Sequence, residues 1–143
     1  MKFVLSLLLC CFFATDCYSQ TLTATEVPAK VREANKKKYP ATQNTKWKKV
    51  NEGFEASQLI NKKQSVIRYD NNGKLISTET EVTATEVPKL MNDFIISNFK
   101  GKKPSNLHRI SDPAGKISFA AEIEEMRYIF DSKGNFLEQV QEY

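Results

Sequence analysis

A six-residue sequence occurs twice in this chain without a change, and this repetition constrains the fold more than any other feature. Residues 23–28 read TATEVP, and residues 83–88 read TATEVP again. A second pair of similar segments follows in the same order, because residues 69–75 (YDNNGKL) resemble residues 130–136 (FDSKGNF). Two pairs of similar segments that occur in the same order and at nearly the same spacing indicate a duplicated unit.

Each copy is expected to begin with a helix near its TATEVP sequence. Thr25 and Thr85 are suited to cap the two helices, and Pro28 and Pro88 fit a first helical turn. Apolar residues then recur at helical spacing, which gives each helix one apolar face. These residues are Val27, Val31 and Ala34 in the first copy, and Val87, Met91, Phe94 and Ile95 in the second.

Segments with strand composition follow each helix, and tight turns separate them. The turn sequences at residues 70–73 and 131–134 each end in a glycine, which we expect in a left-handed conformation. The chain is therefore predicted to be an α+β protein, a tandem repeat of a helix packed on an about four-stranded antiparallel sheet. The expected strands are 45–50, 54–60, 65–69 and 74–82 in the first copy, and 106–111, 116–122, 126–130 and 135–141 in the second.

The first nineteen residues have the layout of a secretory signal. Lys2 precedes an apolar run over residues 3–14, and small residues lie before Gln20. We predict a signal peptide over residues 1–19, cleaved near Ser19–Gln20, and a periplasmic or secreted protein made of repeats 20–82 and 83–143. All three cysteines lie in this signal, so the mature chain must be held together by its core without disulfides. No other long apolar run occurs, so we expect no transmembrane segment in the mature chain.

The repeated motifs resemble those of the secreted PepSY-like family, which is also described as resembling the β-lactamase inhibitor protein. The first copy contributes Val27-Pro28, Tyr39-Pro40, Trp47 and the turn 69–73, and the second contributes Val87-Pro88, Phe99 and the turn 130–134. The second copy departs from the pattern because it has no proline directly after Phe99 and no tryptophan near position 107. The resemblance implies a secreted, non-catalytic protein that holds or inhibits another protein.

The sequence offers little chemistry for catalysis or metal binding. His108 is the only histidine, and the mature chain has no cysteine, so we expect no structural zinc site, no other metal site and no cofactor. Glu122, Glu124 and Glu125 fit a solvated turn better than a catalytic carboxylate pair. We therefore expect no enzyme. A deep pocket that gathers His108 with two carboxylates would reopen that possibility.

The one local concentration of charge is basic. Lys36, Lys37, Lys46, Lys48 and Lys49 lie close together in the sequence, with Lys38 and Trp47 among them. Such a cluster is able to bind a polyanion, and an exposed tryptophan is a frequent binding hot spot. A solvated helix face, with Trp47 under its own helix, explains the same residues. The sequence alone does not show whether Trp47 is exposed.

Two functions follow from these observations. The first is a non-catalytic module that engages a protein of the cell envelope, or outside the cell, through its sheet face, with inhibition of that protein as one outcome. The second is an electrostatic binder of anionic envelope glycan or lipid through the basic cluster between Lys36 and Lys49. The net charge of +4 is too small to indicate a nucleic-acid partner.

Overall fold

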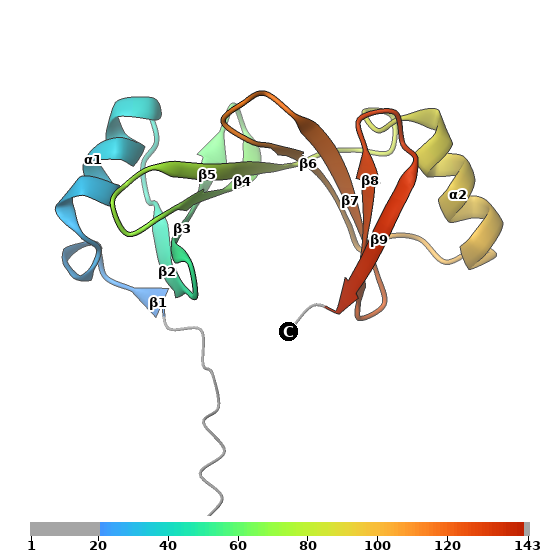
Figure 1. The fold of residues 1–143 in the computed structure, drawn as a ribbon, viewed down its shortest axis with the longest axis horizontal. Coiled ribbons are helices and arrows are strands. Elements are labelled where there is room, and N and C mark those ends of the chain that lie inside the picture. The colour runs from blue at the N-terminus through green and yellow to red at the C-terminus, as the bar shows by residue number, and fades with distance from the viewer. Residues whose placement is uncertain (1–20, 142–143) are drawn as a thin grey trace, which may run out of the picture.

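The computed structural model of the protein describes residues 21–141, which form one antiparallel sheet of nine strands with two helices (Figure 1). The strands follow one another across the sheet in chain order. The first five are β1 (Thr21–Leu22), β2 (Lys46–Val50), β3 (Gly53–Ile60), β4 (Lys63–Tyr69) and β5 (Leu75–Glu81). The last four are β6 (Asn106–Ser111), β7 (Ile117–Ile123), β8 (Met126–Asp131) and β9 (Phe136–Gln141). The helices are α1 (Ala29–Lys38) and α2 (Lys89–Phe99), and a short 3₁₀ turn (Ala24–Glu26) precedes α1.

The repeated hexapeptide forms the entry to both helices. The backbone N–H of Thr23 donates to the Glu26 carboxylate at 2.7 Å, and the N–H of Thr83 donates to Glu86 at 2.9 Å. This side-chain hydrogen bond closes a tight turn before each helix. The identical sequences therefore build closely similar hydrogen-bonded turns.

Both predicted helices are present, but they begin directly after the repeated proline and not before it. The prediction that Thr25 and Thr85 cap the helices is wrong, because Pro28 and Pro88 occupy the cap positions. The threonines instead lie within the turns that lead into the helices.

The predicted fold class, a tandem repeat of a helix packed on an about four-stranded antiparallel sheet, is wrong. Strand β5 pairs with β6, from Thr78 opposite Ser111 to Glu81 opposite His108, so that all nine strands belong to one sheet. The physical reason is that an edge strand exposes unpaired N–H and C=O groups, and the two inner edges satisfy each other. Strand composition predicts eight of the nine strands, all except β1, but it does not show which edges meet.

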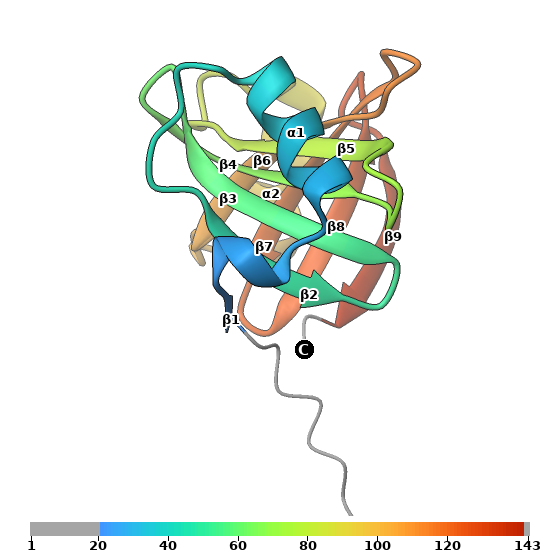
Figure 2. The same cartoon turned by 90° about the vertical axis from the view of Figure 1, so that its left-hand side faces the viewer.

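Both helices pack on one face of this sheet, at its two opposite ends. Figure 1 shows the sheet as an arch, with α1 and α2 on its outer side and a concave inner side. In Figure 2, α1 crosses in front of β3 and β4. The inner face of the arch therefore has no helix over it.

Two apolar clusters fill the space between the helices and the sheet. Their buried members alternate along the strands, as expected for a sheet with one covered face. The cluster under α1 contains Val27, Val31, Trp47, Phe54, Ala56, Ile67 and Tyr69. The cluster under α2 contains Val87, Met91, Ile95, Phe119, Ala121, Ile123 and Phe130.

The two glycine turns touch the helices, and their predicted left-handed conformation is confirmed. Gly73 has a φ of +83° and Gly134 a φ of +91°. A Cβ atom on Gly134 would lie 2.7 Å from the backbone nitrogen of Met91 in α2. A Cβ atom on Gly73 would lie 2.6 Å from the backbone oxygen of Lys30 in α1. Each turn thus packs directly against the first turn of its helix, where there is no space for a side chain.

Replacing Gly134 tests this close approach. We expect Gly134→Ala to lower the free energy of unfolding by about 3 kcal/mol, because both the positive φ and the contact with α2 oppose a methyl group. Gly101 is a matched control, since its φ is +89° and a Cβ there meets nothing within 4 Å. Gly101→Ala should cost only about 1 kcal/mol. Urea denaturation measures both, and equal losses would show that the contact has no effect.

Candidate functional site

The concave face of the sheet carries a broad hollow. Its volume is about 570 Å³. Because side chains alternate along a strand, residues that alternate with the apolar clusters point toward this face. The lining consists of Lys48, Glu55, Val66, Arg68, Glu79, His108, Glu122, Arg127, Val140 and Gln141.

Four of these side chains form a closed ring of contacts between ionisable groups across strands β5 to β8. The Arg127 guanidinium donates to Glu79 Oε1 at 2.6 Å and to Glu122 Oε1 at 3.3 Å. His108 lies on the other side of the same two oxygens, with Nδ1 at 3.3 Å from Glu79 and Nε2 at 3.1 Å from Glu122. Each carboxylate therefore contacts both Arg127 and His108.

The ring is largely shielded from solvent although it lies on an uncovered face. The exposed fractions of its side chains are 13% for Arg127 and 18% for His108, and Glu79 as a whole residue is 7% exposed. Charges in such a position are stable only when they are paired. A second pair beside the ring, Arg68 with Glu55 at 2.7 Å, extends the network toward β2.

The structure gathers His108 with two carboxylates, which is part of the condition for a catalytic site. Both carboxylates, however, are bound by Arg127. In residues 21–141, no serine, threonine or cysteine side chain is hydrogen-bonded to His108. The cluster thus lacks the paired nucleophile and base that covalent catalysis needs.

The structure places Trp47 in the core under α1, with an exposed fraction of 5%. Its neighbours there include Val27 and Val31. The side chain is therefore not available to a partner on the surface of this conformation.

The predicted basic cluster is divided between the two sides of the sheet. Lys36, Lys37 and Lys38 form the last turn of α1, on the outer side. Lys46 and Lys48 alternate with the buried Trp47 and so point toward the concave face. Lys49 points the other way, where its ammonium lies 4.0 Å from the centre of the Phe54 ring and 2.8 Å from Asn71.

The sequence drew attention to His108 and Glu122, but it did not indicate that the sheet brings them together with Glu79 and Arg127. Glu79 and Arg127 are forty-eight positions apart and have no motif between them. Glu122 was expected at the end of a strand, in a solvated acidic group, and it lies in β7 with its side chain in the ring. Alternating charged residues in neighbouring strands were the one available signal, and their use required knowledge of the β5–β6 pairing.

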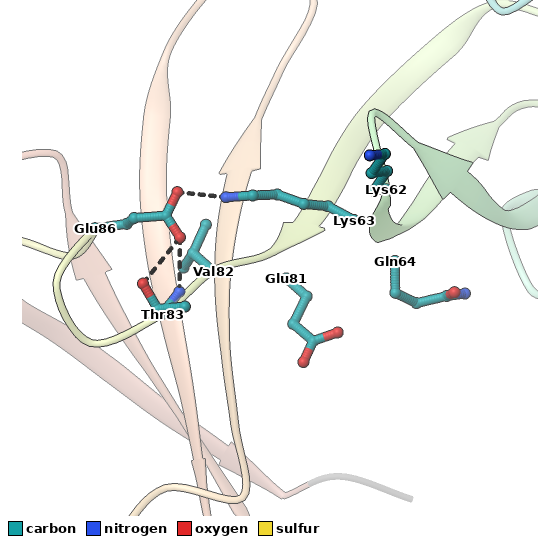
Figure 3. A pocket seen from close by; sticks show the side chains of 7 residues that line it. All are labelled: Lys62, Lys63, Gln64, Glu81, Val82, Thr83 and Glu86. Carbon is teal, nitrogen blue, oxygen red and sulfur yellow. Dashed lines mark hydrogen bonds and ion pairs between the residues drawn. The ribbon is translucent and has the colours of Figure 1, made fainter.

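A second hollow, of about 240 Å³, lies where β4 meets the segment after β5 (Figure 3). Figure 3 shows the Lys63 ammonium bound to the Glu86 carboxylate, which also accepts hydrogen bonds from Thr83. The hydrogen bond from Lys63, followed by those from Thr83, lowers the pKa of Glu86 from 4.5 to about 2. These groups satisfy one another, so we assign this hollow a structural role.

Comparison with known proteins finds solved structures with a similar fold and low sequence identity. A DUF2874 family protein from Bacteroides uniformis is 20% identical over 80% of this chain and 88% of its own, with a TM-score of 0.71. A candidate periplasmic protein from Bacteroides eggerthii is 21% identical over the same shares, with a TM-score of 0.72. A BLIP-like protein from Bacteroides fragilis is 19% identical over 80% of this chain and 85% of its own, with a TM-score of 0.64. No family profile and no curated protein matches the sequence.

These likenesses define a class of fold, which this chain shares with DUF2874 and BLIP-like proteins. The part of the expected resemblance that concerns the β-lactamase inhibitor protein is thus supported at the level of the fold. The PepSY-like part stays a prediction. No helix within residues 21–141 is long and apolar enough to cross a membrane.

Removing the arginine of the ring should destabilise the protein. We expect Arg127→Met to lower the free energy of unfolding by about 1–3 kcal/mol, because it leaves Glu79 and Glu122 shielded without that cation. Lys89 offers a matched control, since its pair with Asp93 lies on the exposed surface of α2. Lys89→Met should change stability by about 0.5 kcal/mol or less. Urea denaturation compares the two, and similar losses would contradict a structural role for the ring.

The lowered pKa of Glu86 predicts how this residue affects stability with pH. Its charged form is favoured in the folded state, so its contribution is fully present above pH 4.5 and is lost as the pH falls toward 2. The difference in unfolding free energy between the wild type and Glu86→Gln should therefore shrink across this range. Glu26→Gln is the control for the contribution of Lys63, because the Glu26 pKa is lowered by hydrogen bonds from Thr23 and not by a lysine. A difference for Glu86→Gln that does not change between pH 5 and pH 2 would contradict the assignment.

Proposed function

We propose that this protein is a non-catalytic module that binds a protein partner on the concave face of its sheet. The observation that carries this proposal is an uncovered hollow of about 570 Å³ whose charged side chains are held in place by one another. A surface of this kind presents fixed charges and loses little side-chain freedom when a partner binds.

The position of the two helices supports the same proposal. Both lie on the outer side of the arch, so the inner side is free to receive a convex partner along its length (Figure 1). Apolar and charged groups alternate within the hollow, where Val66 and Val140 lie among the ion pairs. Fixed charges of this kind give a protein interface its specificity through complementary charges on the partner.

The comparisons support a location in the cell envelope and a protein as the partner. One structural neighbour is described as a candidate periplasmic protein and another as BLIP-like. We propose that this chain also acts in the periplasm or outside the cell, after cleavage of residues 1–19. That segment lies outside the described residues. Inhibition of the partner is the consequence to be assayed once a complex is available.

The division of the lysines weighs against the second function, an anionic glycan or lipid bound through the basic cluster. Lys36 and Lys37 lie on the helix side of the sheet, whereas Lys46 and Lys48 point into the concave side. One ligand would have to pass around the edge of the sheet to contact all of them. We therefore favour the protein partner.

A pair of variants tests the proposed binding face. Val66 lines the hollow and is paired with Glu79 across β4 and β5, and Ile96 lies on α2, where it is 71% exposed. We expect Val66→Arg to reduce retention of the partner from an envelope extract by about 10-fold or more, because it places a long cation in the centre of the interface. The same exchange at Ile96 should leave retention unchanged.

The readout is quantitative mass spectrometry of proteins retained by each immobilised variant, after thermal unfolding has verified that both variants are folded. A protein lost with Val66→Arg but kept with Ile96→Arg is the expected result. Retention of every bound protein by Val66→Arg would contradict the proposed face. Release of all ligands at low salt, with equal loss from a Lys36→Glu/Lys37→Glu variant, would favour the anionic ligand.

A further inference from the structure

We infer that His108 and Glu122 hold one divalent transition-metal ion of the zinc type on the concave face, with Glu79 orienting the histidine ring. The ion would lie in the same hollow as the proposed partner face, but its binding is testable on the protein alone. It rests on three observations: His108 Nε2 faces Glu122 Oε1 without a hydrogen bond, the distance between these two atoms suits a shared metal ion, and the surrounding groups hold both side chains.

The first observation is a buried nitrogen that faces an oxygen without a hydrogen bond. His108 Nε2 has no hydrogen-bond partner, although it lies 3.1 Å from Glu122 Oε1. In a neutral imidazole one nitrogen donates and the other accepts. When Nδ1 donates toward Glu79, Nε2 turns a lone pair toward a negatively charged oxygen. Two acceptor atoms that face each other in this way repel unless a cation lies between them.

The second observation is the distance itself. Zinc binds imidazole nitrogen and carboxylate oxygen at about 2.0–2.1 Å with tetrahedral angles, so two ligand atoms of one ion lie about 3.3 Å apart. The distance of 3.1 Å between Nε2 and Oε1 is close to this value. Potential ligand atoms of Glu79, His108 and Glu122 all lie within 4.8 Å of one another. Small side-chain rotations are enough to admit the ion.

The third observation is the set of groups behind the ligands. Metal-bound histidines usually direct their second nitrogen to a carboxylate, which fixes the ring. Here Nδ1 lies 3.3 Å from Glu79 Oε1. The Glu122 carboxylate is held in turn by Arg127 and by Asn106, whose amide donates to Oε2 at 2.5 Å. Arg127 also offsets part of the negative charge, so the ion need not neutralise both carboxylates alone.

The ligand types select the class of metal. Imidazole with carboxylate suits zinc, nickel and copper, whereas calcium and magnesium prefer sets made only of oxygen. A site with two side-chain ligands on an uncovered face leaves further positions open to water from the hollow. This arrangement differs from a closed structural zinc site, which the residue composition argues against.

Isothermal titration of the metal-free protein with zinc chloride tests the site at neutral pH. We expect one zinc ion per chain. His108→Gln and Glu122→Gln should each weaken binding by about 100-fold, and Glu79→Gln by about 10-fold, because it keeps an acceptor for Nδ1–H but loses the charge. Glu55→Gln is the matched control, since it removes a carboxylate from the same hollow that pairs with Arg68. Zinc binding that survives in His108→Gln, or is lost equally in Glu55→Gln, would overturn the site.

The ring nitrogens of His108 give a second readout, because the chain has no other histidine. In nitrogen-15 spectra, zinc should shift the Nε2 resonance and leave Nδ1 protonated. The opposite result is an imidazole that carries protons on both nitrogens and whose resonances do not change when zinc is added. It would show that a proton, and not a metal ion, lies between His108 and Glu122. That result would overturn the metal site and leave the proposed partner face unaffected. Failure of the Val66→Arg test would have no bearing on zinc binding.

Discussion

The pairing of β5 with β6 is the constraint on which the rest of the structure depends. It joins the strands of the two halves into one sheet, through a ladder that runs from Thr78–Ser111 to Glu81–His108. A sheet of nine twisted strands with a helix at each end of one face becomes an arch (Figure 1). The other face of that arch is the concave surface. Without this ladder, Glu79 would not lie beside His108.

The concave surface combines charge with shielding from solvent. Glu79 and Glu122 come from different halves of the chain, and they are brought together with Arg127 and His108 over four adjacent strands. Shielded charges are expensive unless they are paired, and here each one has partners of opposite sign or a site for a cation. The resulting surface is ordered before any ligand arrives. We propose that a partner recognises this fixed arrangement of charged side chains.

Local features of this fold were predictable from the sequence, and long-range features were not. The helices after Pro28 and Pro88 and the left-handed glycines at 73 and 134 follow from short-range conformational preferences. The single sheet was missed because hydrophobic alternation does not specify which edge strands pair. The ion-pair ring was missed for the same reason. The exposure of Trp47 also depends on the packing of α1, which no spacing reveals.

Chemical labelling of lysines, with and without a bound partner, tests the central claim most directly. Lys46 and Lys48 point toward the concave side, whereas Lys36 and Lys37 lie on the exposed end of α1. Acetylation rates measured by mass spectrometry report which of these amines a partner covers. Our account predicts that binding slows acetylation of Lys46 and Lys48 and leaves Lys36 and Lys37 unchanged. Protection of Lys36 and Lys37, with Lys46 and Lys48 still reactive, would contradict it.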